Sequence, residues 1–105
     1  MLGSIVKKIF GTRQPVIITT KHRGVFFGYA DPTTVNDEQI KLTGARNCIA
    51  WKRSVGGVFG LAGTGPNAEC RIGAMMQAIT LRDITAVIEC TPVAAKAWED
   101  APCVS

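Results

Sequence analysis

The stretch from Gln14 to Glu89 decides the fold, because it is a series of short apolar runs separated by glycine and polar turns. The runs are PVIITTK (15–21), GVFFGYA (24–30), EQIKL (38–42), RNCIAWK (46–52), GVFGLAG (57–63), AITL (78–81) and ITAVIE (84–89). Each run has the length and residue content of a half-buried strand. We therefore predict a mainly β protein, a small barrel or sandwich of six to eight mostly antiparallel strands.

Two local patterns refine this prediction. Residues 54–57 are typical of a hairpin turn, and we expect them to lead into a strand from Val58 to Ala62. The apolar alternation changes phase between Leu81 and Ile84, which predicts a bulge or sharp bend at residues 82–83.

Each end of the chain carries a helix signal. Residues 1–13 form an expected amphipathic arm with a short helix, whose apolar stripe is Leu2, Ile5, Val6, Ile9 and Phe10. This stripe can dock on the chain's own barrel or bind a partner subunit. At the other end, Thr91 is a helix cap and Pro92 the first helical residue, which predicts a helix over about residues 92–99. Residues 14–105 would then form one β-rich domain.

Length and composition limit the class of protein. A chain of 105 residues has room for one core, and 47% apolar with 19% charged residues is a globular balance. No apolar run approaches the roughly 20 residues that cross a bilayer. At the N-terminus the apolar residues precede Lys7 and Lys8, which is the wrong order for a secretory signal. We expect a protein that is not exported through a signal peptide.

The formal net charge of +4 does not make the chain a nucleic-acid binder. Three basic residues, Lys7, Lys8 and Arg13, lie in the N-terminal arm, which leaves nine basic against eight acidic residues in the rest of the chain. Binding to nucleic acid depends largely on concentrated positive charge that neutralises phosphates. The nearly neutral body of the domain therefore argues against it.

The cysteines show no spacing typical of a metal site. Cys48, Cys70, Cys90 and Cys103 are far apart, none belongs to a C-x-x-C pair, and His22 is the only histidine. We expect reduced thiols, with Cys48 and Cys90 acting as small apolar residues in strands. No metal and no cofactor is predicted.

No catalytic motif is present, so we expect a protein that is not an enzyme. The best candidate for a ligand site is a set of arginines and neighbouring residues near strand ends, where loops converge: Arg23, Arg46, Asn47, Trp51, Lys52, Arg53 and Arg71. Arginine binds phosphate or carboxylate through two parallel hydrogen bonds, and an aromatic ring stacks on a base. The alternative is that these arginines lie on an ordinary surface and that Trp51 belongs to the core.

Four segments resemble one family of small uncharacterised proteins encoded mainly by bacteriophages and prophages. They are HRGVFFGY (22–29), ARNCIAW (45–51), GPNAECRIG (65–73) and LRDITAVIECTPVAAKAWEDAP (81–102). An aromatic residue is usual in the family where this chain has Ala50, and residues 1–14 lie outside the shared region. The resemblance implies a viral origin and a shared β-rich fold, and it supplies no activity.

Two functions remain open from the sequence. The first is a virion accessory subunit, similar to a capsid cement or decoration protein, that forms a homo-oligomer or binds other phage structural proteins through the apolar stripe of the arm. The second is an early anti-defence or host-takeover protein that binds a signalling nucleotide or a host protein. The expected location is the virion in the first case and the host cytoplasm in the second.

Overall fold

The computed structural model describes residues 14–21, 24–30 and 39–103. Its elements, in chain order, are β1 (Gln14–Thr20), β2 (Val25–Ala30), β3 (Gln39–Ala50), a short 3-10 helix (Arg53–Val55), α2 (Gly57–Gly63), β4 (Arg71–Ile72), β5 (Met76–Arg82), β6 (Ile84–Glu89) and α3 (Pro92–Asp100). The chain is thus mainly β, as the sequence predicts. The expected N-terminal helix, within residues 1–13, lies outside the described residues.

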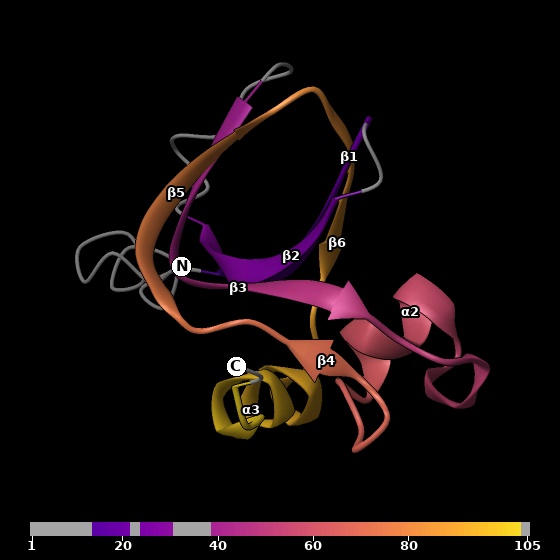
Figure 1. The fold of residues 1–105 in the computed structure, drawn as a ribbon. Coiled ribbons are helices and arrows are strands. Elements are labelled where there is room, and N and C mark those ends of the chain that lie inside the picture. The colour runs from indigo at the N-terminus through magenta and orange to yellow at the C-terminus, as the bar shows by residue number, and fades with distance from the viewer. Residues whose placement is uncertain (1–13, 22–23, 31–38, 104–105) are drawn as a thin grey trace, which may run out of the picture.

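All six strands belong to one curled antiparallel sheet (Figure 1). Its order is β4-β3-β2-β1-β6, and β5 pairs with β3. The long strand β3 pairs with β5 along its first half and with β4 near its end. Within the described ranges no ladder joins β5 to β6, so the sheet curls without closing. The expected number and antiparallel pairing of the strands are thus confirmed, and the strands form one curled sheet that is not closed.

Two backbone positions bend the strands into this shape. The predicted break at residues 82–83 is confirmed: β5 ends at Arg82, Asp83 has φ +55°, and β6 begins at Ile84. The Asp83 carbonyl accepts a hydrogen bond from Lys21 N at 2.8 Å, which ties this corner to the end of β1. Gly44, also at φ +55°, lies inside β3. The runs EQIKL and RNCIAWK are therefore parts of one bent strand.

The predicted strand from Val58 to Ala62 is wrong, since these residues lie in α2. The cause is packing rather than helix propensity, because glycine is a poor helix former. A Cβ atom at Gly60 would lie 1.7 Å from the carbonyl oxygen of Val55, so only glycine lets the helix turn back on the preceding 3-10 turn. The helix in return buries Leu61 and Ala62 against the sheet.

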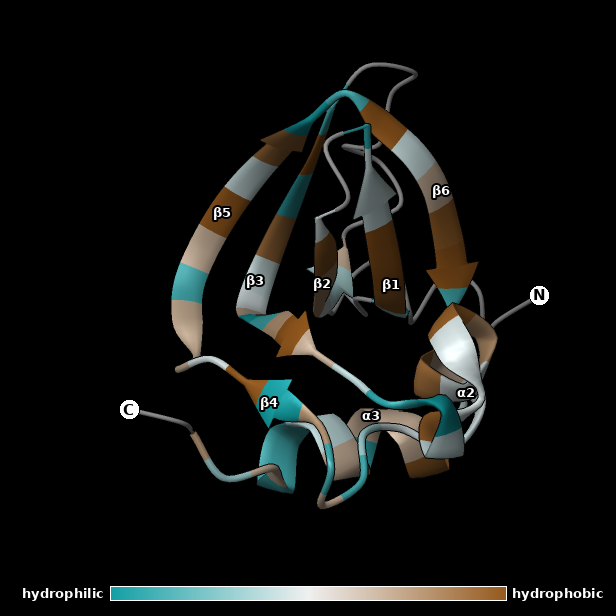
Figure 2. Ribbon diagram, turned by 45° about the vertical axis from the view of Figure 1, so that its right-hand side comes forward, coloured by the Kyte–Doolittle hydropathy of each residue, from teal (hydrophilic) through white to brown (hydrophobic). Residues whose placement is uncertain are grey.

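The sheet carries one core on each face. The outer core lies between the convex face and the two helices and contains Ile17, Val25, Phe27, Cys48, Val55, Leu61, Ala62, Ile72, Ala95 and Trp98. The inner core lines the concave face and contains Val16, Ile18, Ala30, Ile40, Leu42, Ala45 and Leu81. Successive residues of β1 alternate between the two, because side chains of a strand point to opposite faces. Figure 2 shows the resulting brown bands along the strands.

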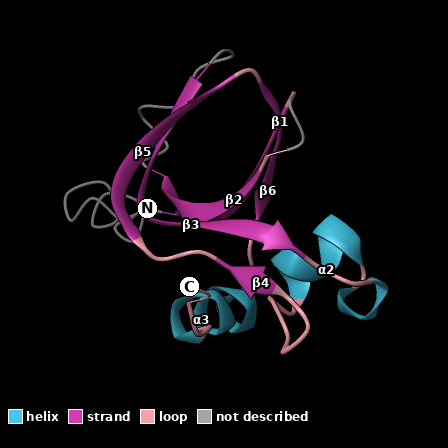
Figure 3. Cartoon of the chain, viewed as in Figure 1, coloured by secondary structure: helices cyan, strands magenta, loops and turns pink. Residues whose placement is uncertain are grey.

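The C-terminal helix is confirmed as α3. The Thr91 side chain accepts a hydrogen bond from Ala94 N at 3.1 Å, and Pro92 occupies the first helical turn. Thr91 also bonds to the end of α2 through the carbonyl oxygens of Ala62 and Gly63. As a result α2 and α3 lie together at one end of the sheet (Figure 3). No helix in the described part of the chain is long and apolar enough to cross a membrane.

Candidate functional site

Arg46, one of the predicted ligand residues, is an internal structural residue. Its side chain is only 3% exposed. Nε donates to the Gly73 carbonyl oxygen at 2.9 Å, and Nη1 donates to the carbonyl oxygens of Trp98, at 2.9 Å, and Ala101. The guanidinium thereby joins the start of the β4–β5 connection to the end of α3. All three of these hydrogen bonds go to carbonyl oxygens of the protein itself.

The other predicted ligand residues lie at different depths. Asn47 is half-buried on the concave face, opposite Phe26 in the ladder. Trp51 is half-buried and packs against the outer core, as in the alternative that places it in the core. Arg71 is exposed on β4. Arg23 lies outside the described residues, as does His22.

A small polar network surrounds the turn before β4, and no sequence motif predicts it. The Asn67 side chain accepts from Glu69 N at 3.0 Å and donates to Ser54 Oγ at 3.2 Å. Ser54 Oγ donates to Glu69 Oε1 at 2.5 Å, and Lys52 Nζ lies 3.9 Å from Glu69 Oε2. These exposed groups satisfy one another, which is typical of a stabilised turn.

An open groove of about 320 Å³ lies beside this turn and the end of α3. Its lining residues are Pro66, Asn67, Ala68, Cys70, Ile72, Ala97, Asp100, Ala101 and Pro102. Most of these side chains are small and apolar, and Asp100 is already 3.3 Å from Lys96 Nζ. The groove therefore brings together few groups that recognise a ligand.

Cys48, Cys70 and Cys90 are free thiols. Burial raises the pKa of Cys48 to about 12, and the nearby Cys70 thiol adds to this, while a hydrogen bond with the Ala50 backbone opposes it. Burial likewise raises the pKa of Cys90 to about 12. Both thiols stay protonated at neutral pH, which makes them poor nucleophiles. No group of three or more His, Cys, Asp or Glu residues in the described ranges is arranged to hold a metal ion.

The outer edges of β5 and β6 form no ladder with another strand in the described part of the chain. We call this part of the fold the seam and define it by these two strand edges and by the concave-face residues Met76, Ile79, Ile84 and Val87. Figure 2 shows β5 and β6 as the two sides of an arch with β1, β2 and β3 behind it. Val87 lies opposite the buried Ile18 in the ladder, yet it is 46% exposed.

Two further large apolar residues are exposed at the end of this arch that lies nearer the helices. Ile49, near the end of β3, and Met75, just before β5, are each 54% exposed. By strand parity Ile49 lies on the concave face with Ala45. Isolated exposed apolar residues are ordinary, but a group next to two unpaired strand edges is typical of an interaction surface.

Comparison with known proteins places the chain in a family. Residues 13–98 match the family described as a domain of unknown function (DUF6948), and the chain belongs to it. No curated protein and no solved structure gives a significant match. The shared region begins at the start of β1 and ends in α3, so most of the N-terminal arm lies outside it.

Proposed function

We propose that this protein is a non-enzymatic assembly subunit of bacteriophage or prophage origin, acting as a virion accessory protein similar to a capsid cement or decoration subunit. The observation that carries the proposal is the seam, where the exposed Val87 and the half-buried Met76, Ile79 and Ile84 lie along two strand edges that form no further ladder within the described residues. Such edges associate readily with another chain unless they are covered. A protein whose work is to bury surface against neighbours needs a surface of this kind.

The chemistry of the remaining surface supports this proposal. The two most buried thiols are held protonated, and the groove beside α3 presents mainly small apolar groups. The arm of residues 1–13 supplies a second apolar surface, with Leu2, Ile5, Val6, Ile9 and Phe10 as its stripe. One chain thus carries two surfaces suited to contacts between proteins.

The test is quantitative mass spectrometry on gradient-purified particles of the phage that encodes the protein. We expect tens to hundreds of copies per particle, the order of a symmetric assembly. A chain without residues 1–13 should lose particle association and keep its fold, because the described members of both cores all lie from Val16 onward. Absence of the protein from particles, or association that survives the deletion, contradicts the virion role.

A binder of a signalling nucleotide or host protein is the second candidate, supported by the basic surface at the end of β3. Arg71 pairs with Ala50 in the ladder, and the exposed Lys52 and Arg53 follow two and three residues later. Arg46 is engaged internally, which removes one cation from the predicted set. Arg71→Ala and Trp51→Ala should then lose a nucleotide in calorimetric titration while the domain stays folded. Unchanged binding would remove this site.

A further inference from the structure

We infer that the seam is the acceptor for residues 1–13 of a second copy of this chain, so that subunits join head to tail. This inference rests on the proposed assembly role and names the partner of its surface. Each polypeptide then carries both the inserted segment, which we call the donor, and the surface that receives it, which we call the acceptor. This head-to-tail arrangement generates rings or filaments rather than only two-fold dimers.

The acceptor side is incomplete within a single chain. Along β6, Val87 shares the concave face with Ile84 and is 46% exposed, while its ladder neighbour Ile18 is fully buried. Across the arch, Met76 and Ile79 of β5 are only partly buried against the same inner core. The inner core therefore continues to the surface between the two strands, where one more apolar layer would complete it.

The donor side has the matching size and pattern. Thirteen residues precede β1, and their apolar stripe recurs at helical spacing over Leu2 to Phe10. A helix of this length spans about 20 Å, comparable to a strand of six or seven residues. That is the length of β5 and of β6, which have 7 and 6 residues. The stripe can thus cover the seam along most of its length.

The charges of the two sides are complementary. The arm carries Lys7, Lys8 and Arg13 with no acidic residue. At the end of β6, Glu89 follows Val87 on the concave face and is exposed. An ion pair there adds little affinity at the surface but fixes orientation and rejects the reversed arm.

We assign the arm of a second copy as the occupant because an assembly subunit needs its donor and its acceptor on different chains, and the acceptor residue Val87 is 46% exposed. The arm joins the domain at Gln14, at the end of β1 where Pro15 O accepts a hydrogen bond from Cys90 N at 2.9 Å. It therefore starts beside the end of β6, at the outer margin of the fold, where a neighbouring molecule can be reached.

The experiment measures molar mass by light scattering during size exclusion over a dilution series of the full chain. We expect at least twice the monomer mass for the wild type. Val87→Asp damages the acceptor alone, with the milder Val87→Ser as a second acceptor variant in case the first fails to fold. The double variant Ile5→Asp with Ile9→Asp damages the donor alone. Each should be monomeric, with an unchanged circular dichroism spectrum.

A mixture of the acceptor variant and the donor variant shows whether the arm of one chain fills the seam of another. The Val87→Asp chain keeps its arm and the Ile5→Asp, Ile9→Asp chain keeps its seam, so an equimolar mixture should form a 1:1 dimer and stop there. Phe59→Asp is the matched control, since Phe59 is 79% exposed on α2, which packs on the convex face of the sheet, and this variant should assemble as wild type. A monomeric wild type would mean that the arm docks in its own chain and would overturn the inference. So would a mixture that stays monomeric, or a Phe59→Asp chain that dissociates.

This result is separate from the virion role. If the purified protein assembles head to tail but is absent from particles, the proposed function fails and the inference stands. If the protein is found in particles but the mixed variants do not pair, the inference fails and the proposed function stands.

Discussion

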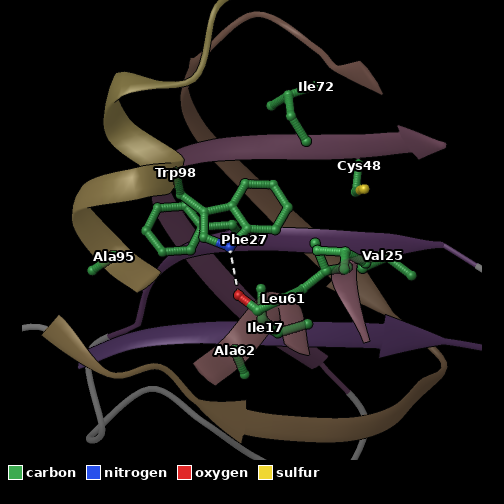
Figure 4. Packing of buried hydrophobic residues seen from close by; sticks show 10 residues of the cluster. Ile17, Val25, Phe27, Cys48, Leu61, Ala62, Ile72, Ala95 and Trp98 are labelled. Carbon is green, nitrogen blue, oxygen red and sulfur yellow. Dashed lines mark hydrogen bonds between the residues drawn. The ribbon is translucent and has the colours of Figure 1, made fainter. Parts of the chain in front are cut away.

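Trp98 of α3 stacks on Phe27 of β2, with ring centroids 5.2 Å apart and ring planes 5° from parallel (Figure 4). The indole Nε1 of Trp98 also donates to the Leu61 carbonyl oxygen of α2 at 2.9 Å. One fully buried side chain thus connects the sheet with both helices. The end of the family match at residue 98 places this tryptophan inside the shared region.

Two substitutions of Trp98 should separate the contribution of its ring packing from that of its hydrogen bond. Trp98→Ala leaves a large cavity beside Phe27 and should lower the free energy of unfolding by about 3–5 kcal/mol. Trp98→Phe keeps an aromatic ring but leaves the Leu61 carbonyl unpaired, which should cost about 1–3 kcal/mol. Urea denaturation measures both, with the exposed Val93→Ala as the control on the same helix. Trp98→Phe with wild-type stability would contradict the role of the hydrogen bond, and equal losses for the two variants would contradict the role of ring packing.

Arg46 should behave as a stabilising residue rather than a binding residue. Arg46→Met removes the donor for three carbonyl oxygens, of Gly73, Trp98 and Ala101, and should destabilise the fold by roughly 2–4 kcal/mol. Arg46→Lys should recover only part of the lost stability, because an ammonium group cannot reproduce the planar arrangement of donors in the guanidinium group. Arg71→Met, on the exposed β4 residue, is the matched control and should change stability by less than about 0.5 kcal/mol. Arg46→Met with wild-type stability would show that the bonds to α3 contribute nothing.

The sequence predicts this fold where the signal is local. The bend at Asp83 appears as a phase change in the alternation, and the start of α3 appears as Thr91-Pro92, because both depend on neighbouring residues. The sequence does not predict the helix α2, because GVFGLAG is apolar on all sides and only contact with Val55 and the sheet makes it helical. The apolar runs in the sequence also do not show whether β5 and β6 pair with each other.

The candidate site was harder to predict for the same reason. Arg46 has the sequence surroundings of a surface arginine, and its partners Trp98 and Ala101 lie 52 and 55 residues away along the chain. Val87 is exposed on β6, whose outer edge forms no ladder within the described residues, and no local sequence pattern predicts this.

The cysteines should divide by reactivity at pH 8. With a pKa of about 12, only about one Cys48 or Cys90 thiol in ten thousand is ionised at that pH, and the thiolate is the reactive form. Cys103 is exposed and should be alkylated first. Mass spectrometry after brief iodoacetamide treatment measures the order, and treatment in denaturant is the control in which all four react. Modification of Cys48 as fast as Cys103 would contradict the buried setting of its thiol.

Tyr29 should titrate at a distinctly high pH, and as the only tyrosine it can be followed by its absorbance near 295 nm. Burial raises its pKa most, and the hydrogen bond that its hydroxyl donates to Glu99 raises it further, together with the charge of Glu99. In the native protein the midpoint should lie well above the value near 10 that the unfolded chain shows. Glu99→Gln should lower the native midpoint and leave the unfolded one unchanged.

The raised pKa of Tyr29 also determines how the stability of the protein changes with pH. Because the folded pKa is the higher one, the folded state holds the Tyr29 proton more tightly, and this contribution to stability is fully present below about pH 10. As the pH rises from about 10 through the folded pKa, the contribution is lost and the free energy of unfolding falls. Tyr29→Phe removes this titration, so its unfolding free energy should fall less over that range. If wild type and Tyr29→Phe lose stability in parallel, other groups cause the alkaline loss, and the contact between Tyr29 and Glu99 does not couple the sheet to α3.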